Sequence, residues 1–320
     1  MYSSLMKKMF NLLFYFSFIL AASSQSFLMI WISFELNILM FMTISKKMNY
    51  SLSNSLMKYF IIQSMSSSMF LMSFLYMYYE KTNNQIWFLM MILAIWMKMG
   101  LFPFHQWYFQ MSENIEWKMW MLLNTAQKAI PLWIMSIKQI SYNYMMTLII
   151  INSAYSIMEM WNQVSIRWMI NSSSLNHFSW MMMSFNNTNS YWMYYMFTYF
   201  IMFFCMSMMM EKICNNSIIN LMNEENLLNK MLFNLMMMNF MGLPPLSGFL
   251  PKYFVLISSN SMMLMMLMIL INILISYMYM MFCQNIIMFN FKKKLKSMKY
   301  NTNLMLMNFM LLMPIIMFLI

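Results

Sequence analysis

Long apolar runs recur along the whole chain, and their length constrains its fold more than any other feature. Most runs are close to the roughly 20 residues that an α-helix needs to cross the hydrocarbon core of a bilayer. Hydrophobic residues make up 62% of the 320 residues and charged residues only 8%, whereas charged residues are about a quarter of an ordinary soluble domain. The chain is therefore predicted to be an all-α polytopic membrane protein without a separate soluble domain.

The polar breaks between the runs predict eleven transmembrane helices. Their approximate bounds are 9–22, 25–44, 55–79, 85–109, 119–139, 144–161, 168–185, 190–210, 228–258, 261–285 and 302–320. We predict one transmembrane domain over residues 1–320, with an inner-side loop at about 211–227 and a C-terminal helix at about 302–320. Because no small-residue cleavage site follows Lys7 and Lys8, we expect the first run to be a retained helix.

The basic residues test this topology, because short inner-side loops of membrane proteins are enriched in Lys and Arg. With the N-terminus inside, only Lys81 and Lys138 fall in outer segments. The inner segments collect Lys7, Lys8, Lys46, Lys47, Lys58, Lys118, Arg167, Lys212, Lys230, Lys292, Lys293, Lys294, Lys296 and Lys299. The basic run at 291–299 is interpreted as an orientation signal, and no nucleic-acid partner is expected.

Three lysines belong to neither the inner nor the outer segments and lie inside the predicted crossings. Lys98 lies in WMKMGLFPFHQW, Lys128 in NTAQKAIPLW and Lys252 in MGLPPLSGFLPKYF. All three glycines and five of the six prolines of the chain lie in these stretches. A broken helix at membrane depth exposes backbone amides and carbonyls, which is tolerable only inside protein or along a polar cavity. Because intramembrane charges usually mark ion or proton pathways, these lysines are candidate proton-carrying groups. The alternative is that they extend to the membrane surface.

Three further titratable residues lie within predicted crossings. Glu35 is at the middle of the second crossing, and Lys98 is its natural partner. The alternative is a static buried pair that only fixes helix packing. His105 follows Lys98 by seven residues, and His177 stands in the seventh crossing. Both are candidates for proton shuttling, while a hydrogen-bonded buried imidazole and a pair of axial haem ligands remain as alternatives.

Other chemistry finds less support in the sequence. Cys205, Cys214 and Cys283 have no CxxC spacing, so neither a disulfide framework nor a metal site is predicted. Runs of methionine suggest soft-metal binding, but such runs are expected by chance among 56 methionines. No GxxxxGK[ST], GxGxxG or HExxH motif is present, so nucleotide and zinc chemistry are not indicated.

Six stretches between about residues 25 and 258 resemble a known family. In order they are WISFELNILMFM, SLMKYFIIQSMSS, WMKMGLFPFHQW, NTAQKAIPLW, IRWMINSSSLNHFSWMM and MGLPPLSGFLPKYF. They are similar to the mitochondrially encoded antiporter-like subunits of NADH:ubiquinone oxidoreductase, respiratory complex I. The resemblance implies an antiporter-like fold with two interrupted helices, a polar axis in the membrane plane and proton pumping. It also implies the mitochondrial inner membrane, which with the charge distribution puts the N-terminus on the matrix side and the C-terminus on the intermembrane-space side.

The resemblance also implies roles for individual residues. Glu35 would modulate Lys98, the lysine of the first interrupted helix. Lys128 would be the central connecting lysine, and Lys252 the lysine of the second interrupted helix, near the outlet.

By the same resemblance, His105 and His177 would bridge these groups through water. NADH, FMN, iron–sulfur clusters and ubiquinone would bind other subunits, so no cofactor or metal is expected in this chain. The implied partners are other membrane-arm subunits, including chain 4 and the small chain 4L, and lipids such as cardiolipin. Two alternatives remain: a stand-alone cation/proton antiporter subunit, and a structural membrane subunit without its own proton path.

Overall fold

Every regular element that the computed structural model describes is an α-helix. The structure describes residues 2–24, 26–45, 50–80, 85–137, 142–161, 163, 165–185, 191–213, 227–259 and 261–288. Within these ranges there is no β-strand, which confirms the predicted all-α class. This part of the chain belongs to two compact units, Met1–Lys138 and Gln139–Ile320, and each is described by itself. The prediction of one transmembrane domain stays a prediction.

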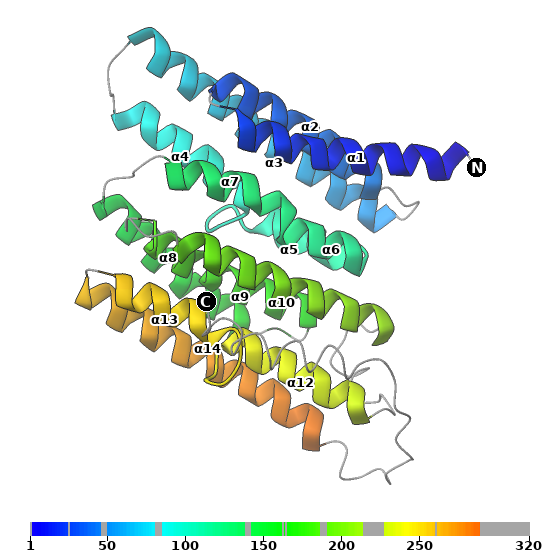
Figure 1. Cartoon of the computed structure of the whole chain (residues 1–320), viewed down its shortest axis with the longest axis vertical. Helices are drawn as coiled ribbons and strands as arrows, with labels where there is room; N and C mark the ends of the chain where they lie inside the picture. Colours follow the sequence, from blue (N-terminus) through cyan, green and yellow to red (C-terminus); the bar gives the residue numbers. More distant parts are fainter. Residues whose placement is uncertain are drawn as a thin grey trace. The chain divides into compact units, whose positions relative to one another are not determined.

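Helices of the first unit lie side by side with their axes roughly aligned (Figure 1). They are α1 (Tyr2–Ser23), α2 (Phe27–Ser45), α3 (Tyr50–Glu80), α4 (Gln85–Met99), α5 (Gln106–Asn114), α6 (Trp117–Asn124) and α7 (Ala126–Ile137). Helix α3 packs against α2, α4 and α5, while α7 packs against α1, α4 and α6. The short helices α5, α6 and α7 follow the Gly/Pro stretch after α4, where the sequence predicts broken helix geometry.

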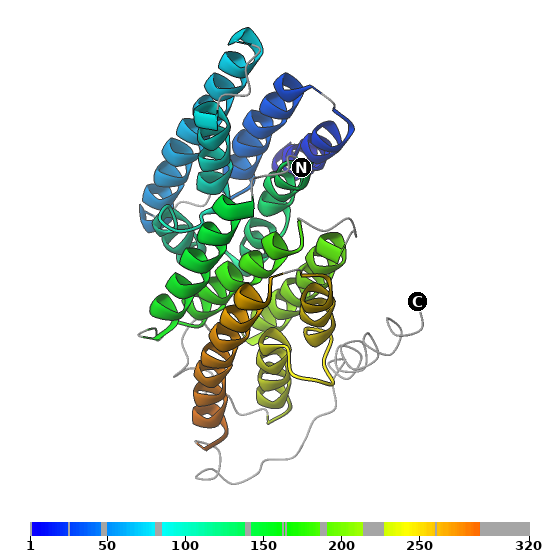
Figure 2. The same ribbon diagram turned by 90° about the vertical axis from the view of Figure 1, so that its left-hand side faces the viewer.

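The second unit, drawn from green to orange in Figure 2, contains one helix that is almost entirely buried. Its helices are α8 (Tyr142–Trp161), α9 (Ile166–Met183), α10 (Tyr191–Ile213), α12 (Leu227–Met241), α13 (Phe249–Ser258) and α14 (Met262–Met288). Helix α9 contacts α8, α10, α13 and α14. Apart from the half-buried Trp168, every residue of α9 is buried. Its many serines, its asparagines and His177 therefore face protein.

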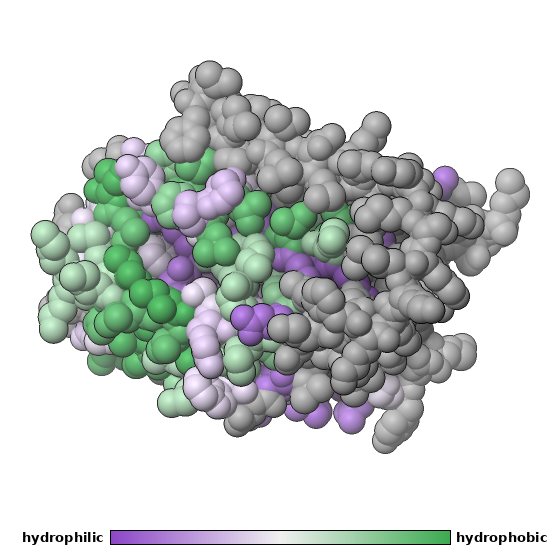
Figure 3. Space-filling model, turned by 90° about the horizontal axis from the view of Figure 1, so that it is seen from below, coloured by the Kyte–Doolittle hydropathy of each residue, from purple (hydrophilic) through white to green (hydrophobic). Residues whose placement is uncertain are grey.

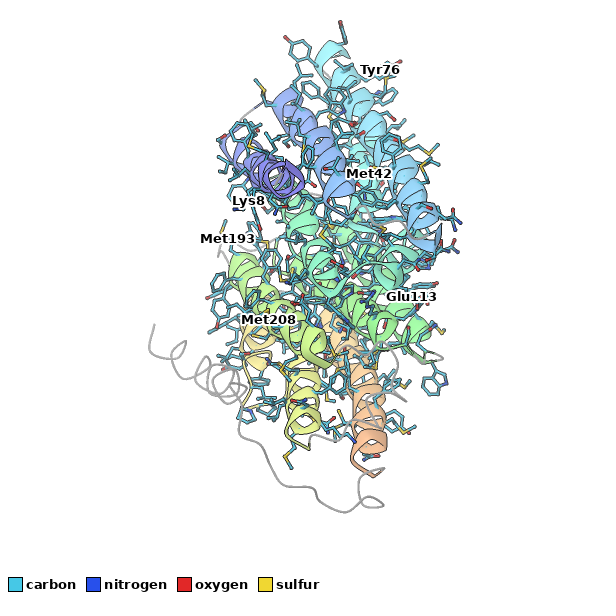
Figure 4. All side chains as sticks on the ribbon, turned by 90° about the vertical axis from the view of Figure 1, so that its right-hand side faces the viewer. Lys8, Met42, Tyr76, Glu113, Met193 and Met208 are labelled. Carbon is cyan, nitrogen blue, oxygen red and sulfur yellow. The ribbon has the colours of Figure 1, made fainter. Side chains whose placement is uncertain are left out.

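Much of the outer surface is apolar, as expected of a chain that faces lipid. In the part of the chain that the structure describes, four helical segments are long and apolar enough to cross a membrane: Phe27–Ser45, Ser51–Tyr79, Tyr191–Glu211 and Met262–Gln284. Helix α14 exposes methionine, leucine and isoleucine side chains along most of its length. Figure 3 shows such hydrophobic residues over one face, and Figure 4 labels Met193 and Met208, two exposed side chains of α10.

Some sequence predictions fall elsewhere in the structure or outside the described residues. The predicted inner loop at 211–227 begins within α10, which extends to Ile213, and residues 214–226 lie outside the described ranges, as does the predicted helix at 302–320. Arg167 and Lys230 were assigned to inner-side segments, but they lie in the first turns of α9 and α12 and are buried. A long side chain at a helix end can lie along neighbouring helices instead of entering water, so position in the sequence did not reveal their burial.

Candidate functional site

Helix α4 ends directly after Lys98 because Gly100 adopts a left-handed conformation, with φ of +66°. The Gly100 N–H donates to the Met97 carbonyl at 3.1 Å, and the Leu101 N–H donates to the Trp96 carbonyl at 3.3 Å. These two bonds form a Schellman motif, in which glycine avoids the steric cost that a Cβ would add. Local sequence therefore fixes the end of the helix directly after the lysine.

The Lys98 side chain is 4% exposed and lies within the protein. Its Nζ lies 4.1 Å from the centroid of the Phe34 ring on α2 and has no hydrogen-bond partner in the described part of the chain. The neighbouring Glu35 carboxylate acts on this ammonium electrostatically. The Ser67 hydroxyl on α3 donates a hydrogen bond to Glu35 Oε1. The structure thus brings Glu35 near Lys98, as predicted, but no direct hydrogen bond joins them.

Lys128 lies in the first turn of α7, just after the boundary with α6. Helix α6 ends at Asn124, and the Thr125 N–H and hydroxyl both donate to the Met121 carbonyl, at 2.9 and 2.8 Å. Lys128 is 2% exposed, and its Nζ lies 3.9 Å from the centroid of the Tyr108 ring on α5. Electrostatic attraction between an ammonium and an aromatic face is strongest where water is excluded. The ring therefore stabilises a buried charge.

His105 marks the start of α5 and is buried. Its ring stacks on Phe102, with centroids 5.9 Å apart, and meets Phe109 edge-on at 5.7 Å. Its carbonyl accepts from the Tyr108 and Phe109 amides. The first unit therefore holds His105 together with Glu35, Lys98 and Lys128.

Lys252 is bonded to the end of another helix. Helix α12 ends at Met241, and Gly242 follows with φ of +78°. The Lys252 Nζ donates to the Met241 carbonyl and to Asn272 Oδ1 on α14, both at 2.7 Å. Lys252 is 5% exposed and lies within the protein. A carbonyl freed at the helix end thus becomes a ligand for the ammonium.

The segment between α12 and α13 is packed tightly on Asn239. The Gly248 N–H and the Ser247 hydroxyl both donate to Asn239 Oδ1, at 2.7 and 3.0 Å. A Cβ added at Gly248 would lie 2.0 Å from the Asn239 carbonyl oxygen. Only glycine permits this close approach. The approach fixes the main chain that precedes Lys252, whose side chain extends to the Met241 carbonyl.

His177 lies at the centre of the second unit. Its Nδ1 is 2.8 Å from the Tyr195 hydroxyl, and its ring contacts Tyr199 and Phe240 with centroids 5.6 and 6.1 Å apart. Lys252 acts on it electrostatically. The second unit therefore brings His177 and Lys252 together. The haem hypothesis stays a hypothesis, because His105 and His177 belong to different units.

Sequence reasoning missed several residues that contact the predicted groups, among them the polar residues Ser67, Tyr108, Tyr195 and Asn272. Asn272 was the easiest of these to find from the sequence, because it is the one amide in the middle of the apolar run 261–285. The others carry no comparable signal, since the chain contains many serines and 19 tyrosines.

Comparisons with known proteins identify the family and the fold of the chain. A family model described as NADH:quinone oxidoreductase/Mrp antiporter, TM, matches residues 24–276. A relative in Anopheles gambiae, NADH-ubiquinone oxidoreductase chain 2, is 30% identical over 318 residues, which cover 93% of this chain and 92% of the relative.

Solved structures share the fold at low sequence identity. A chain of respiratory complex I from Thermus thermophilus matches with a TM-score of 0.80 and 16% identity, over 92% of this chain and 72% of that one. A chain of an archaeal membrane-bound sulfane sulfur reductase matches with a TM-score of 0.78 and 14% identity, over 97% and 72%. The predicted antiporter-like membrane fold is therefore confirmed.

Proposed function

Because this chain belongs to the NADH:quinone oxidoreductase/Mrp antiporter transmembrane family, we infer that it is a proton-translocating subunit of the membrane arm of respiratory complex I. It serves the H⁺-translocating NADH:ubiquinone reductase without a redox site of its own, and NADH, FMN, iron–sulfur clusters and ubiquinone bind other subunits. Its animal relatives place it in the mitochondrial inner membrane as a multi-pass protein.

One observation carries the proposed proton path: all three intramembrane lysines are buried within their helical units instead of facing lipid. A charge at membrane depth costs about 2.5–3.5 kcal/mol on insertion scales, so each lysine needs a compensating environment. Each has a different one. An aromatic face and a nearby carboxylate surround Lys98, a ring face covers Lys128, and two oxygen acceptors bind Lys252.

In the proposed mechanism, energy released by electron transfer elsewhere in the complex changes the interaction between Glu35 and Lys98. Glu35 is held by the Ser67 hydroxyl and not by a direct bond to the lysine, so its influence on Lys98 can change without breaking a hydrogen bond between them. Protons then move by way of Lys98, then His177 or Lys128, and finally Lys252, with His105 also taking part in the relay.

The finer topology belongs to the same proposal. We infer eleven crossings, with α4–α5 and α12–α13 forming the two interrupted transmembrane helices. The left-handed glycines that end α4 and α12 support this assignment. The N-terminus lies on the matrix side and the C-terminus on the intermembrane-space side. The partners are other membrane-arm subunits, including chain 4 and chain 4L, together with cardiolipin.

The test is Lys98→Met in the assembled complex, measured as the ratio of protons translocated to electrons transferred in sealed vesicles. Positioned proton-transfer groups contribute about 10²–10⁴-fold to rate, so transport through this path should nearly stop and the ratio should fall. Lys8→Met is the matched control, because Lys8 is exposed on α1 and carries the same charge. An unchanged ratio with Lys98→Met would show that this lysine is not part of the relay. Altered assembly without altered pumping would favour the structural-subunit alternative.

A further inference from the structure

Tyr108 is a fully buried residue of α5 that the proposed relay does not include. Its ring face lies 3.9 Å from the Lys128 ammonium. An aromatic face carries negative electrostatic potential, so it attracts the ammonium more strongly than the neutral amine. The contact therefore depends on the charge of Lys128.

The far end of the same ring is tethered. The Tyr108 hydroxyl donates to Asn124 Oδ1, and the Asn124 amide donates to the Trp120 carbonyl at 3.0 Å. Asn124 is the last residue of α6, immediately before the irregular Thr125 that separates α6 from α7. The hydroxyl thus fixes the ring relative to the helix boundary that precedes Lys128.

The Cβ of Tyr108 lies against the turn at Gly100 that ends α4. A Cβ added at Gly100 would lie 2.7 Å from Tyr108 Cβ and 3.0 Å from a ring carbon of Trp107. No side chain separates the left-handed turn after α4 from α5 at this point. Since Gly100 follows Lys98 by two residues, Tyr108 connects the end of the Lys98 helix to Lys128.

We propose that Tyr108 is a positioning residue for Lys128. The ring face of Tyr108 holds the Lys128 ammonium at a defined place relative to the turns at Gly100 and Thr125. This inference rests on the proposed function, in which Lys128 carries protons. A displacement of the Gly100 turn moves the Tyr108 main chain and, with it, the ring face that lies against Lys128. The residue itself takes no proton.

The experiment compares three single variants, Tyr108→Phe, Tyr108→Leu and Lys128→Met. It also includes the double variant that combines Tyr108→Leu with Lys128→Met. All are studied in the assembled complex in sealed vesicles. Measured are complex assembly, the electron-transfer rate and the ratio of protons to electrons. Tyr108→Phe keeps the ring face and should retain most of the ratio. Tyr108→Leu removes the face, and proton transfer through Lys128 should fall about thirtyfold, as expected for the loss of a desolvated cation–π contact. With Lys128→Met present, Tyr108→Leu should have no additional effect.

The outcomes separate the two proposals. If Lys128→Met leaves the ratio unchanged, the role of Lys128 in the proposed function fails and this inference fails with it. If Lys128→Met lowers the ratio but Tyr108→Leu does not, or if Tyr108→Phe is as defective as Tyr108→Leu, only the role of Tyr108 is overturned. The same holds if the two losses are additive. Should Tyr108→Leu not assemble, Tyr108→Met enters the same comparison, because methionine adapts to irregular packing.

Discussion

At the scale of single residues, the three buried lysines differ in what their ammonium groups touch. Lys252 donates to two oxygen acceptors, whereas Lys98 and Lys128 lie against ring faces. Hydrogen bonds to charged groups contribute about 1.5–3 kcal/mol each, and a desolvated cation–π contact about 2 kcal/mol. Lys252 is therefore held by two directed hydrogen bonds, which suits the proposed role of a group that keeps one geometry while a proton arrives and leaves.

Asn272→Leu should weaken this hold while leaving the lysine in place. Loss of one charged hydrogen bond, at about 1.5–3 kcal/mol, corresponds to roughly a 10- to 100-fold change in an equilibrium involving the bound ammonium. We expect a lower proton-to-electron ratio with preserved electron transfer. Ser276→Ala is the control, because its hydroxyl bonds only to the Ile273 carbonyl one turn earlier on the same helix, at 2.7 Å. Equal ratios in the two variants would contradict the role of Asn272.

At the scale of helices, glycine determines where the elements end beside the lysines. Gly100 and Gly242 adopt positive φ, which side-chain-bearing residues reach only at a cost of about 1–2 kcal/mol. Gly248 is needed for a different reason, because its backbone touches the Asn239 carbonyl. The chain uses its three glycines only at these places, so the ends of α4 and α12 are set by steric requirements more than by packing preference.

Gly248→Ala should be among the most damaging small substitutions in the chain. Its Cβ would lie 2.0 Å from a main-chain oxygen, so the backbone has to shift. Overpacking of this kind costs about 1–3 kcal/mol, and the amount of assembled chain should fall several-fold. The control is Ser258→Ala at the other end of α13, whose hydroxyl bonds within its own helix and whose loss should cost less than about 1 kcal/mol. Equal abundance of the two variants in membranes would show that the α12–α13 turn is not so constrained.

At the scale of the whole molecule, each compact unit buries its candidate proton-carrying lysines and exposes apolar side chains. Helix α3 is long enough to test how the chain crosses the membrane. Ser51 and Tyr78 are 27 residues apart on this helix and both exposed. At 1.5 Å per residue this is about 40 Å, close to the full thickness of a bilayer with its headgroups.

Cysteines placed at these positions should be labelled from opposite sides of the membrane. In a Cys214→Ser background, Ser51→Cys should react with an impermeant thiol reagent only from the matrix side, and Tyr78→Cys only from the intermembrane-space side. The native Cys205 and Cys283 are buried and should stay unlabelled. Labelling of Ser51→Cys from the intermembrane-space side would reverse the orientation derived from the lysine distribution.

The sequence by itself determined the class of fold, the three lysines that need an interior position and the glycines beside them. These follow from local rules: an apolar run of about 20 residues becomes a helix in lipid, and an intramembrane charge requires an interior position. Tertiary structure alone decided what each lysine touches and that Arg167 and Lys230 are buried. Ser67, Tyr108 and Asn272 come from helices other than those of their partners, and in a chain whose helices are nearly all apolar, hydropathy does not indicate which faces pack together.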